Sequence, residues 1–471
     1  MIIGLVDADL MDGGTRHPNL TLLKLAGFFH DHRIEFELIE DENADISKYR
    51  LIYISKVFTF TKNPKFFDEK KEKSLGEDSQ FRWGGTGFYA NETDQKKFIK
   101  LRKEDMARLE KDEFLNQYIC CRGLNKKKGI SMAHQMPYYD LYRPYIEKMI
   151  ANGHKRDLYK DYLDYSIGFL TRGCFRQCPF CVNRLEKLVL PYSDISSFLD
   201  NDRDEKGKLK RPYIYLWDDN FLASSPKLWR PLLNQLIETG RPFQFRQGLD
   251  ERMLADSPHG EEMAETLSRS KYHGDYIFAF DNWSDREKIV KALKIWKRHN
   301  PKKGTKFYLF CGFKQTSDDF EKFYQDIWEI FNRIKILMQY GCIGYIMRHE
   351  DYKNSPLPNM YVQIARWCNQ QQFYKKMSLW EFCYRNQSFW EEQYLPPENI
   401  AGRPALMSFE DFEAELNNPD GHYKNIKLCK SLRTILEMLN MYPDKKKELL
   451  EMFNYKMSNL KNPSLWENQE Q

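Results

Sequence analysis

The hydrophobic positions divide the chain into three stretches with different periods. From Asp164 to about residue 350, short apolar runs with strand character alternate with amphipathic runs of helical period. Strands are expected at Tyr165–Leu170, Tyr213–Trp217, Phe243–Gln247, Tyr276–Phe280, Lys306–Phe310 and Ile343–Met347. Helices are expected at Pro226–Thr239, Glu261–Ser270, Asp285–Arg298 and Asp318–Arg333. This alternation favours parallel strands joined by right-handed crossovers, and it predicts a partial (β/α)6 TIM-like barrel over residues 160–350.

The first 150 residues predict a separate Rossmann-like α/β domain. Its strands are expected at Ile2–Val6, Ile34–Ile39 and Leu51–Ser55, with a helix at Asn19–His32. Farther on, Gly84–Gly87 forms a glycine-rich turn that either lets a ligand approach the backbone or simply makes a tight turn. Lys62–Gln80 is highly charged and has no apolar period, so an exposed insertion is predicted there.

Residues 351–471 predict a third, helical region rich in aromatic residues. Helices are expected at Ser378–Tyr384, Ser408–Leu416 and Asn425–Met441. The cysteines of this region, at 368, 383 and 429, have no recurrent spacing, so they are interpreted as buried apolar thiols. The fold class is therefore α/β, with a Rossmann-like domain, a barrel and a helical C-terminal region in that order.

Composition and charge narrow the class of protein. The chain has 471 residues, enough for two or three domains. It begins with a strand pattern rather than a signal peptide, and no apolar run reaches about 18 residues, so no membrane span is expected. Ten cysteines do not make a disulfide scaffold at this length, which favours a cytoplasmic protein. The net charge of +5 arises from 73 basic and 68 acidic residues, and this balance does not indicate nucleic-acid binding.

Three cysteines carry the strongest chemical signal. Cys174, Cys178 and Cys181 are spaced C-x3-C-x2-C within Gly168-Phe-Leu-Thr-Arg-Gly-Cys-Phe-Arg-Gln-Cys-Pro-Phe-Cys. A [4Fe–4S] cluster is normally held by four thiolates, so three would leave one iron open to a ligand that is not protein. Structural zinc is the alternative, but it usually needs four ligands, and the nearest histidine is His154. The spacing therefore favours an iron–sulfur cluster.

This spacing, the aromatic Phe180 and the preceding Thr-Arg-Gly resemble the radical S-adenosylmethionine (SAM) superfamily. The resemblance implies that SAM chelates the open iron, and that an electron from the cluster cleaves it into methionine and a 5′-deoxyadenosyl radical. It also implies the partial barrel and an electron donor of the flavodoxin or ferredoxin type. The cysteine loop follows the first barrel strand, and the C-terminal ends of barrel strands are where active sites gather.

Polar residues after the later strands are the candidate cofactor ligands. In this family, polar groups after the second strand usually meet the SAM amino group, which makes Asp218, Asp219 and Asn220 candidates; the alternative is an ordinary turn. Gln247-Gly-Leu-Asp-Glu-Arg252 is similar to a Gln-Gly-Leu-Asp-x-Arg segment of some members. There Arg252 would pair with the SAM carboxylate, or else with Asp250. The remaining candidates, for ribose and adenine respectively, are Asp281 and Gly312.

The N-terminal domain resembles a diverged cobalamin-binding domain. The Asp-x-His-x-x-Gly signature is absent, and neither His17, His30 nor His32 replaces it, so cobalamin is possible but not favoured. The expected activity is hydrogen abstraction, or cobalamin-assisted methyl transfer, on an unknown substrate. A methylthiotransferase would need a second three-cysteine cluster, and only Cys120 and Cys121 precede Cys174. The rival hypothesis is an iron–sulfur redox or binding protein without SAM turnover.

Overall fold

The computed structural model describes residues 2–15, 17–90, 92, 94–111, 132–300, 302–394, 406–420 and 426–467. The chain forms two compact units, one of residues 1–249 with 269–274 and one of residues 250–268 with 275–471. The division inferred from sequence, at 1–150, 160–350 and 351–471, stays a prediction. Cys120 and Cys121 lie outside the described residues. None of the helices in the described part of the chain is long and apolar enough to cross a membrane.

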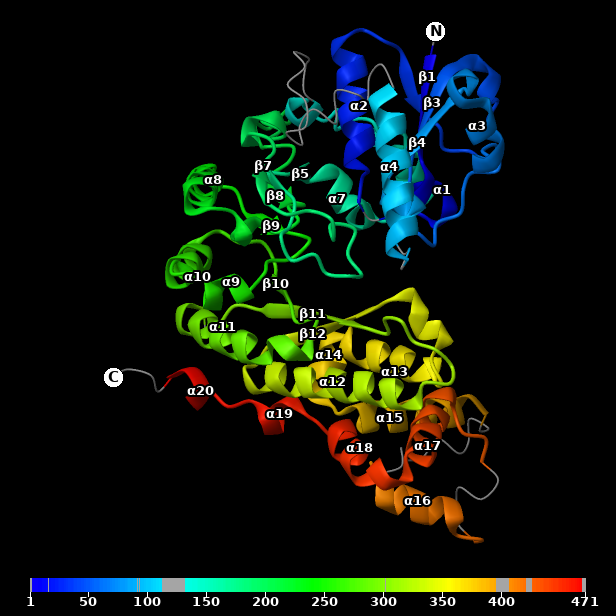
Figure 1. Cartoon of the computed structure of the whole chain (residues 1–471), viewed down its shortest axis with the longest axis vertical. Helices are drawn as coiled ribbons and strands as arrows, with labels where there is room; N and C mark the ends of the chain where they lie inside the picture. Colours follow the sequence, from blue (N-terminus) through cyan, green and yellow to red (C-terminus); the bar gives the residue numbers. More distant parts are fainter. Residues whose placement is uncertain are drawn as a thin grey trace. The chain divides into compact units, whose positions relative to one another are not determined.

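The first unit begins with a four-stranded parallel sheet (Figure 1). Its strands are β1 (Ile2–Asp7), β2 (Phe36–Leu38), β3 (Tyr49–Ser55) and β4 (Phe81–Gly84), in the order β2-β1-β3-β4. The chain therefore reverses direction across the sheet between β1 and β3, which is where doubly wound folds bind ligands. The three predicted strands are confirmed. The fourth, β4, was not predicted as a strand, because four residues are too short to show a period; only its last residue, Gly84, had been assigned, to the glycine turn.

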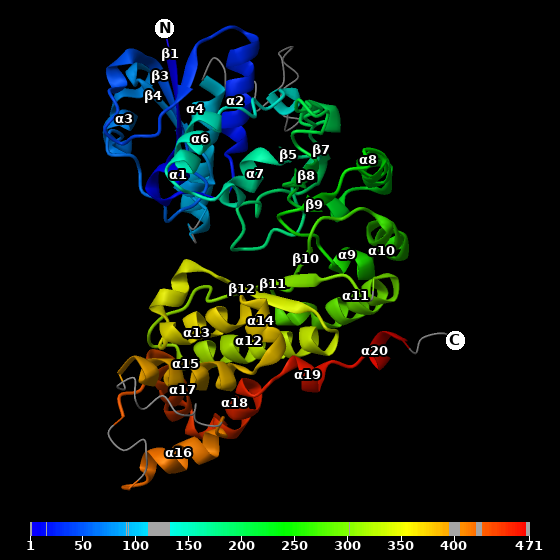
Figure 2. The ribbon, with the colours of Figure 1, turned by 180° about the vertical axis from the view of Figure 1, so that it is seen from behind.

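Hydrophobic cores cover both faces of this sheet. Helix α2 (Leu20–Asp31) packs on the face that carries Ile3 and Leu5, and α3 (Glu69–Leu75) lies on the other side (Figures 1 and 2). The segment Lys62–Gln80 is exposed at most of its described positions, as predicted, but it also contains α3 and buries Phe67. Phe67 is buried, with its ring 5.3 Å from that of Trp83. A single buried aromatic residue, Phe67, among many charged residues produces no hydrophobic period in the sequence.

The strands predicted for the barrel are all present, in two parallel sheets of three. In the first unit, β5 (Tyr165–Gly168), β8 (Tyr213–Leu216) and β9 (Phe243–Phe245) pair in the order β5-β8-β9. Helix α8 (Pro226–Glu238) buries Trp229, Leu233 and Leu236. The second unit holds β10 (Tyr276–Ala279), β11 (Thr305–Cys311) and β12 (Ile343–Arg348). The six strands are thus confirmed, whereas their closure into one barrel stays a prediction.

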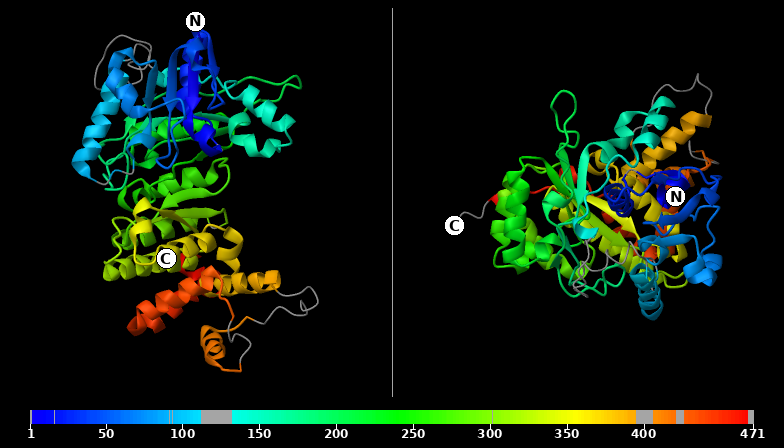
Figure 3. Two further views of the ribbon diagram at one scale, coloured as in Figure 1. Left: turned by 90° about the vertical axis from the view of Figure 1, so that its right-hand side faces the viewer. Right: turned by 90° about the horizontal axis from the view of Figure 1, so that it is seen from above.

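Helices dominate the rest of the second unit (Figure 3). The predicted amphipathic helices α10 (Gly260–Arg269), α11 (Arg286–His299) and α12 (Phe320–Gln339) are present. Beyond β12 come α13 (Pro358–Cys368), α15 (Leu379–Tyr394), α16 (Phe409–Asn417), α17 (Lys430–Met441) and α18 (Lys446–Phe453). The three helices expected in this region are therefore confirmed. Cys368, Cys383 and Cys429 are buried thiols, as the sequence indicated.

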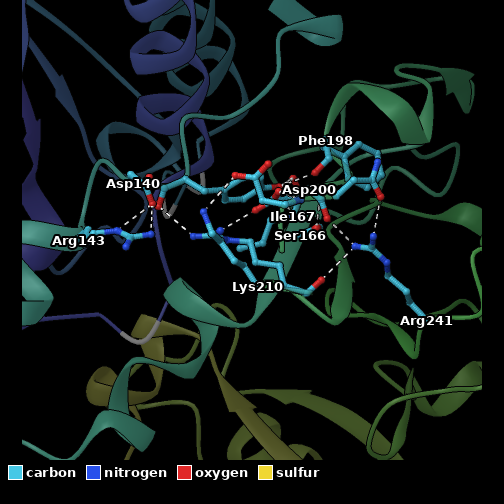
Figure 4. Close-up of polar contacts among 12 residues, drawn as sticks. Asp140, Arg143, Ser166, Ile167, Phe198, Asp200, Lys210 and Arg241 are labelled. Atoms are coloured by element: carbon cyan, nitrogen blue, oxygen red, sulfur yellow. Dashed lines mark hydrogen bonds and ion pairs between the residues drawn. The ribbon is translucent and has the colours of Figure 1, made fainter. Parts of the chain in front are cut away.

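A polar network ties the segment before β5 to the starts of β8 and β9 (Figure 4). Arg211, shortly before β8, donates to the Asp200 carboxylate at 2.7 Å and to the Tyr139 carbonyl at 3.2 Å. Arg241, shortly before β9, donates to the carbonyls of Asp200 at 2.7 Å and Arg211 at 3.0 Å. These groups lie at the N-terminal edge of the sheet, away from the cysteine loop. The network therefore links the segments that precede β8 and β9 at this edge of the sheet.

We expect Arg211→Met to lower the free energy of unfolding by roughly 3 kcal/mol, because it leaves the mostly buried Asp200 carboxylate without its cation. Urea unfolding measures the loss. Arg143→Met is the matched control, since the Arg143–Asp140 pair is exposed on both sides and contributes less than about 1 kcal/mol. Equal losses in the two variants would contradict the role given to Arg211.

Candidate functional site: the cysteine loop

The loop that carries the three cysteines is closed at its base by a short antiparallel ladder. Thr171 and Arg172 form β6 (Thr171–Arg172), and they pair with Pro191 and Leu190 of β7 (Leu190–Pro191). The loop therefore leaves the C-terminal end of β5 and returns to the same place. Gly173 begins it with φ +99°, and a Cβ there would lie 2.3 Å from the Leu188 carbonyl oxygen. Only glycine fits this position without moving the backbone.

Hydrogen-bond donors point at two of the cysteine sulfurs. The backbone N–H of Arg176 donates to Cys174 Sγ at 3.5 Å, and that of Asn183 donates to Cys181 Sγ at 3.4 Å. The Asn220 side-chain amide donates to Cys174 Sγ at 3.3 Å. N–H donors around thiolate ligands are one of the means by which proteins stabilise iron–sulfur clusters. The predicted residue Asn220 therefore contacts a cysteine directly.

The three thiols also act on one another electrostatically. Burial, with a smaller contribution from the neighbouring Cys178 and Cys174, raises the pKa of Cys181 to about 11. Among the described residues, no group of three His, Cys, Asp or Glu side chains converges on a position for a single metal ion. A cubane makes a different demand, because each thiolate binds its own iron at a separate corner. All three cysteines of the loop are half-buried.

Asp218 and Asp219 hold the loop. One Asp218 oxygen accepts from the Thr171 N–H and hydroxyl, both at 2.6 Å, and the other accepts from the Leu170 N–H at 3.1 Å. Asp219 accepts from the Gly173 N–H at 2.8 Å and pairs with the Arg172 guanidinium at 3.1 Å. Burial raises the pKa of Asp218 to about 7. Both carboxylates thus fix the start of the cysteine loop, a role that their position after β8 did not reveal.

Gln247 and Arg252 fall in different units. Gln247, just after β9 in the first unit, is exposed. Arg252, in the second unit, donates from Nε to Asp250 at 2.7 Å and from Nη1 to Asp285 at 2.8 Å. The two carboxylates raise the pKa of this guanidinium against the effect of burial. From the sequence, Arg252 was expected to pair either with the SAM carboxylate or with Asp250. In the structure it pairs with Asp250.

Asp281 and Gly312, also in the second unit, follow β10 and β11. Burial raises the pKa of the Asp281 carboxyl to about 6, while the charge of Arg333 lowers it. The buried Arg333 donates to the Asp281 carbonyl at 3.0 Å. Gly312 has φ +75° and donates its N–H to Asp326 at 2.8 Å. An added Cβ would lie 2.6 Å from Cβ of Tyr352, so the close approach at this glycine is to Tyr352.

The glycine turn of the N-terminal sheet packs against the loop after β3. A Cβ on Gly85, which has φ +112°, would lie 2.3 Å from the Lys56 carbonyl oxygen, and one on Gly87 would lie 2.6 Å from Lys56 Cγ. At the nearby switch point, the Tyr142 hydroxyl donates to Asp7 at 2.7 Å. Gly85 and Gly87 are therefore closely packed against Lys56 within the first unit, as the tight-turn alternative requires.

A polar cluster that the sequence did not indicate lies at the C-terminal ends of β8 and β9. His17 Nδ1 is 2.5 Å from a carboxylate oxygen of Asp161, and His17 Nε2 is 3.2 Å from Nη2 of Arg246. The His17 and Trp217 rings meet edge to face at 5.8 Å. These four residues are scattered over more than two hundred positions, and no local pattern joins them. Only the folded chain brings them together.

Asp218 should make stability depend on pH. Its pKa of about 7 in the folded chain is above the ordinary 3.8, so between these values the folded form keeps a proton that the unfolded form loses. The Asp218 carboxyl therefore contributes fully to the free energy of unfolding below about pH 4. As the pH rises, this contribution falls by up to about 1.4 kcal/mol per pH unit. We expect Asp218→Asn to make the fall of the free energy of unfolding between pH 4 and pH 7, measured by urea unfolding, less steep than in the unsubstituted chain. Asp157→Asn, at an exposed carboxylate, should leave the slope unchanged, and an unchanged slope in Asp218→Asn would contradict this account.

No family model matches the chain, and no curated protein sequence matches it either. Function is therefore inferred from the three-cysteine motif and from the geometry of the loop that carries it.

Proposed function

We propose that the protein is a radical SAM enzyme whose [4Fe–4S] cluster is held by Cys174, Cys178 and Cys181. The observation that carries the proposal is the C-x3-C-x2-C set on one closed loop at the C-terminal end of a parallel strand, with N–H donors aimed at the sulfurs. Three thiolates leave one iron for an outside ligand. Closure of the six parallel strands into a partial barrel belongs to the same proposal.

The chain's own residues would hold and shield these groups. Asn220 donates to Cys174, and Asp218 and Asp219 keep the loop in place. When bound, the cluster and SAM would supply the reductive cleavage that yields methionine and a 5′-deoxyadenosyl radical. Gln247, Arg252, Asp281 and Gly312 stay candidates for SAM. An electron donor of the flavodoxin or ferredoxin type and a reducing cytoplasm complete the proposal, while the substrate is unspecified.

One observation favours the rival candidate, an iron–sulfur redox or binding protein without SAM turnover. Asp218, Asp219 and Arg252 all have contacts within the chain that use their hydrogen-bonding groups. Arg252 would have to exchange one of its carboxylate partners before it could bind a SAM carboxylate. The two candidates share the cluster and differ in whether SAM is cleaved.

Changing any one of Cys174, Cys178 or Cys181 to Ala should abolish the visible iron–sulfur absorption and the formation of 5′-deoxyadenosine. Each thiolate holds its own iron, so no single loss is tolerated. The assay is anaerobic reconstitution with iron and sulfide, followed by SAM and a reductant. Cys429→Ala, at a buried thiol in the second unit, is the control and should keep both signals. A cluster that survives in a loop variant would refute the ligand assignment, and a cluster that yields no 5′-deoxyadenosine would favour the rival candidate.

We also expect the N-terminal domain to retain little or no cobalamin. Gly85 and Gly87 lie against Lys56, and Tyr142 bonds Asp7 at the switch point, so the domain's own residues use the positions that a ligand would need. The measurement is anaerobic titration with hydroxocobalamin, desalting and a visible spectrum. Stoichiometric retention that Gly85→Val removes, with folding preserved by circular dichroism, would contradict this expectation and make cobalamin-assisted methyl transfer the leading reaction.

A further inference from the structure

A buried cation lies within the cysteine loop. Arg184 follows Cys181 by three residues and is 5% exposed. Its Nη1 donates to the Pro179 carbonyl at 2.6 Å, and its backbone N–H donates to the Cys181 carbonyl at 3.2 Å. Since Pro179 stands between Cys178 and Cys181, the guanidinium is bonded to the backbone that separates two of the sulfurs.

The same side chain joins the loop to the N-terminal part of the unit. Arg184 Nη2 donates to the Glu92 carbonyl at 2.5 Å, and the guanidinium lies 3.5 Å from the centre of the Phe98 ring. Phe98 belongs to α4 (Gln95–Lys111) and is fully buried. One turn farther along α4, Arg102 forms an ion pair with Glu186 of the loop. Helix α4 therefore covers the cysteine loop, and Arg184 is the residue enclosed between them.

Neither of the two side-chain hydrogen bonds of Arg184 ends on a carboxylate. Both side-chain partners are carbonyl oxygens, and Nε is buried with no hydrogen-bond partner among the described residues. The Glu92 carboxylate forms its own ion pair with Lys97. Burial lowers the pKa of Arg184, whereas Cys181 and Glu92 raise it. An arginine keeps its charge even when buried, so its field acts on the Cys181 sulfur.

We propose that Arg184 is a positioning residue that raises the reduction potential of the cluster and keeps the cysteine loop closed beneath α4. A reduced cluster is more negative than an oxidised one, so a fixed cation beside its ligands favours reduction. The hydrogen bonds from Arg184 to the carbonyls of Pro179 and Glu92 keep the loop closed, because they link the loop backbone to residue 92. This inference rests on the proposed function, since it requires a cluster on the three cysteines.

The test compares two substitutions that separate charge from geometry. Arg184→Met removes the positive charge but keeps an apolar side chain of similar length. Arg184→Lys keeps the charge but removes the planar guanidinium, which donates to two carbonyls at once. The midpoint potential is measured by EPR-monitored redox titration of the anaerobically reconstituted full chain. Iron release to a chelator reports loop closure. Arg230→Met is the control, because Arg230 also lies over a ring, that of Trp229, but on α8 rather than in the cysteine loop.

We expect Arg184→Met to lower the midpoint potential and Arg184→Lys to restore most of it. Both variants should release iron roughly tenfold faster than the original chain, the effect of losing a charge-assisted hydrogen bond. Arg230→Met should change neither quantity. A cluster whose potential is the same in Arg184→Met, or is lowered equally by Arg184→Lys, would overturn the electrostatic role. Failure of the unsubstituted chain to bind four irons would instead overturn the proposed function, and this inference with it.

Discussion

The cysteine loop depends on two adjacent carboxylates at the end of β8. Asp218 and Asp219 together accept hydrogen bonds from the backbone of Leu170, Thr171 and Gly173, just where the chain leaves β5. Burying such carboxylates is costly unless their lone pairs are satisfied, and the N–H groups of the loop satisfy them. The cysteine loop and the C-terminal end of β8 therefore stabilise each other. This contact sets the position at which the loop, and with it the three sulfurs, begins.

Besides Asp218 and Asp219, several neighbouring elements also hold the cysteine loop in place. The ladder of β6 and β7 closes the base of the loop, Asn220 donates to Cys174, and Arg184 bonds the loop backbone from within. Helix α4 covers the outside through Phe98. The N-terminal part of the first unit consequently has a physical role that needs no ligand of its own. Its glycine turn and Tyr142 are used in packing within the unit.

The sequence was informative where a local pattern has a single structural solution. The six strands alternate with helices, so they could be predicted without tertiary contacts, whereas the cluster inferred from the cysteine spacing stays a prediction. The role of Asp218 could not be predicted, because an aspartate after a strand is equally suited to a ligand and to a backbone anchor. The partner, Thr171, lies 47 residues away. Arg184 and His17 were missed for the same reason, since their significance comes from Phe98 and Asp161, which no local spacing connects to them.

The central claim is that three cysteines bind a cubane and leave one of its irons open. Mössbauer spectroscopy of protein reconstituted with 57Fe tests this most directly, because it resolves irons with different ligands. The account predicts four irons per chain, one of which changes its isomer shift and quadrupole splitting when SAM is added while the other three stay the same. Four irons that are all unaffected by SAM, or a content of one metal ion per chain, would contradict it.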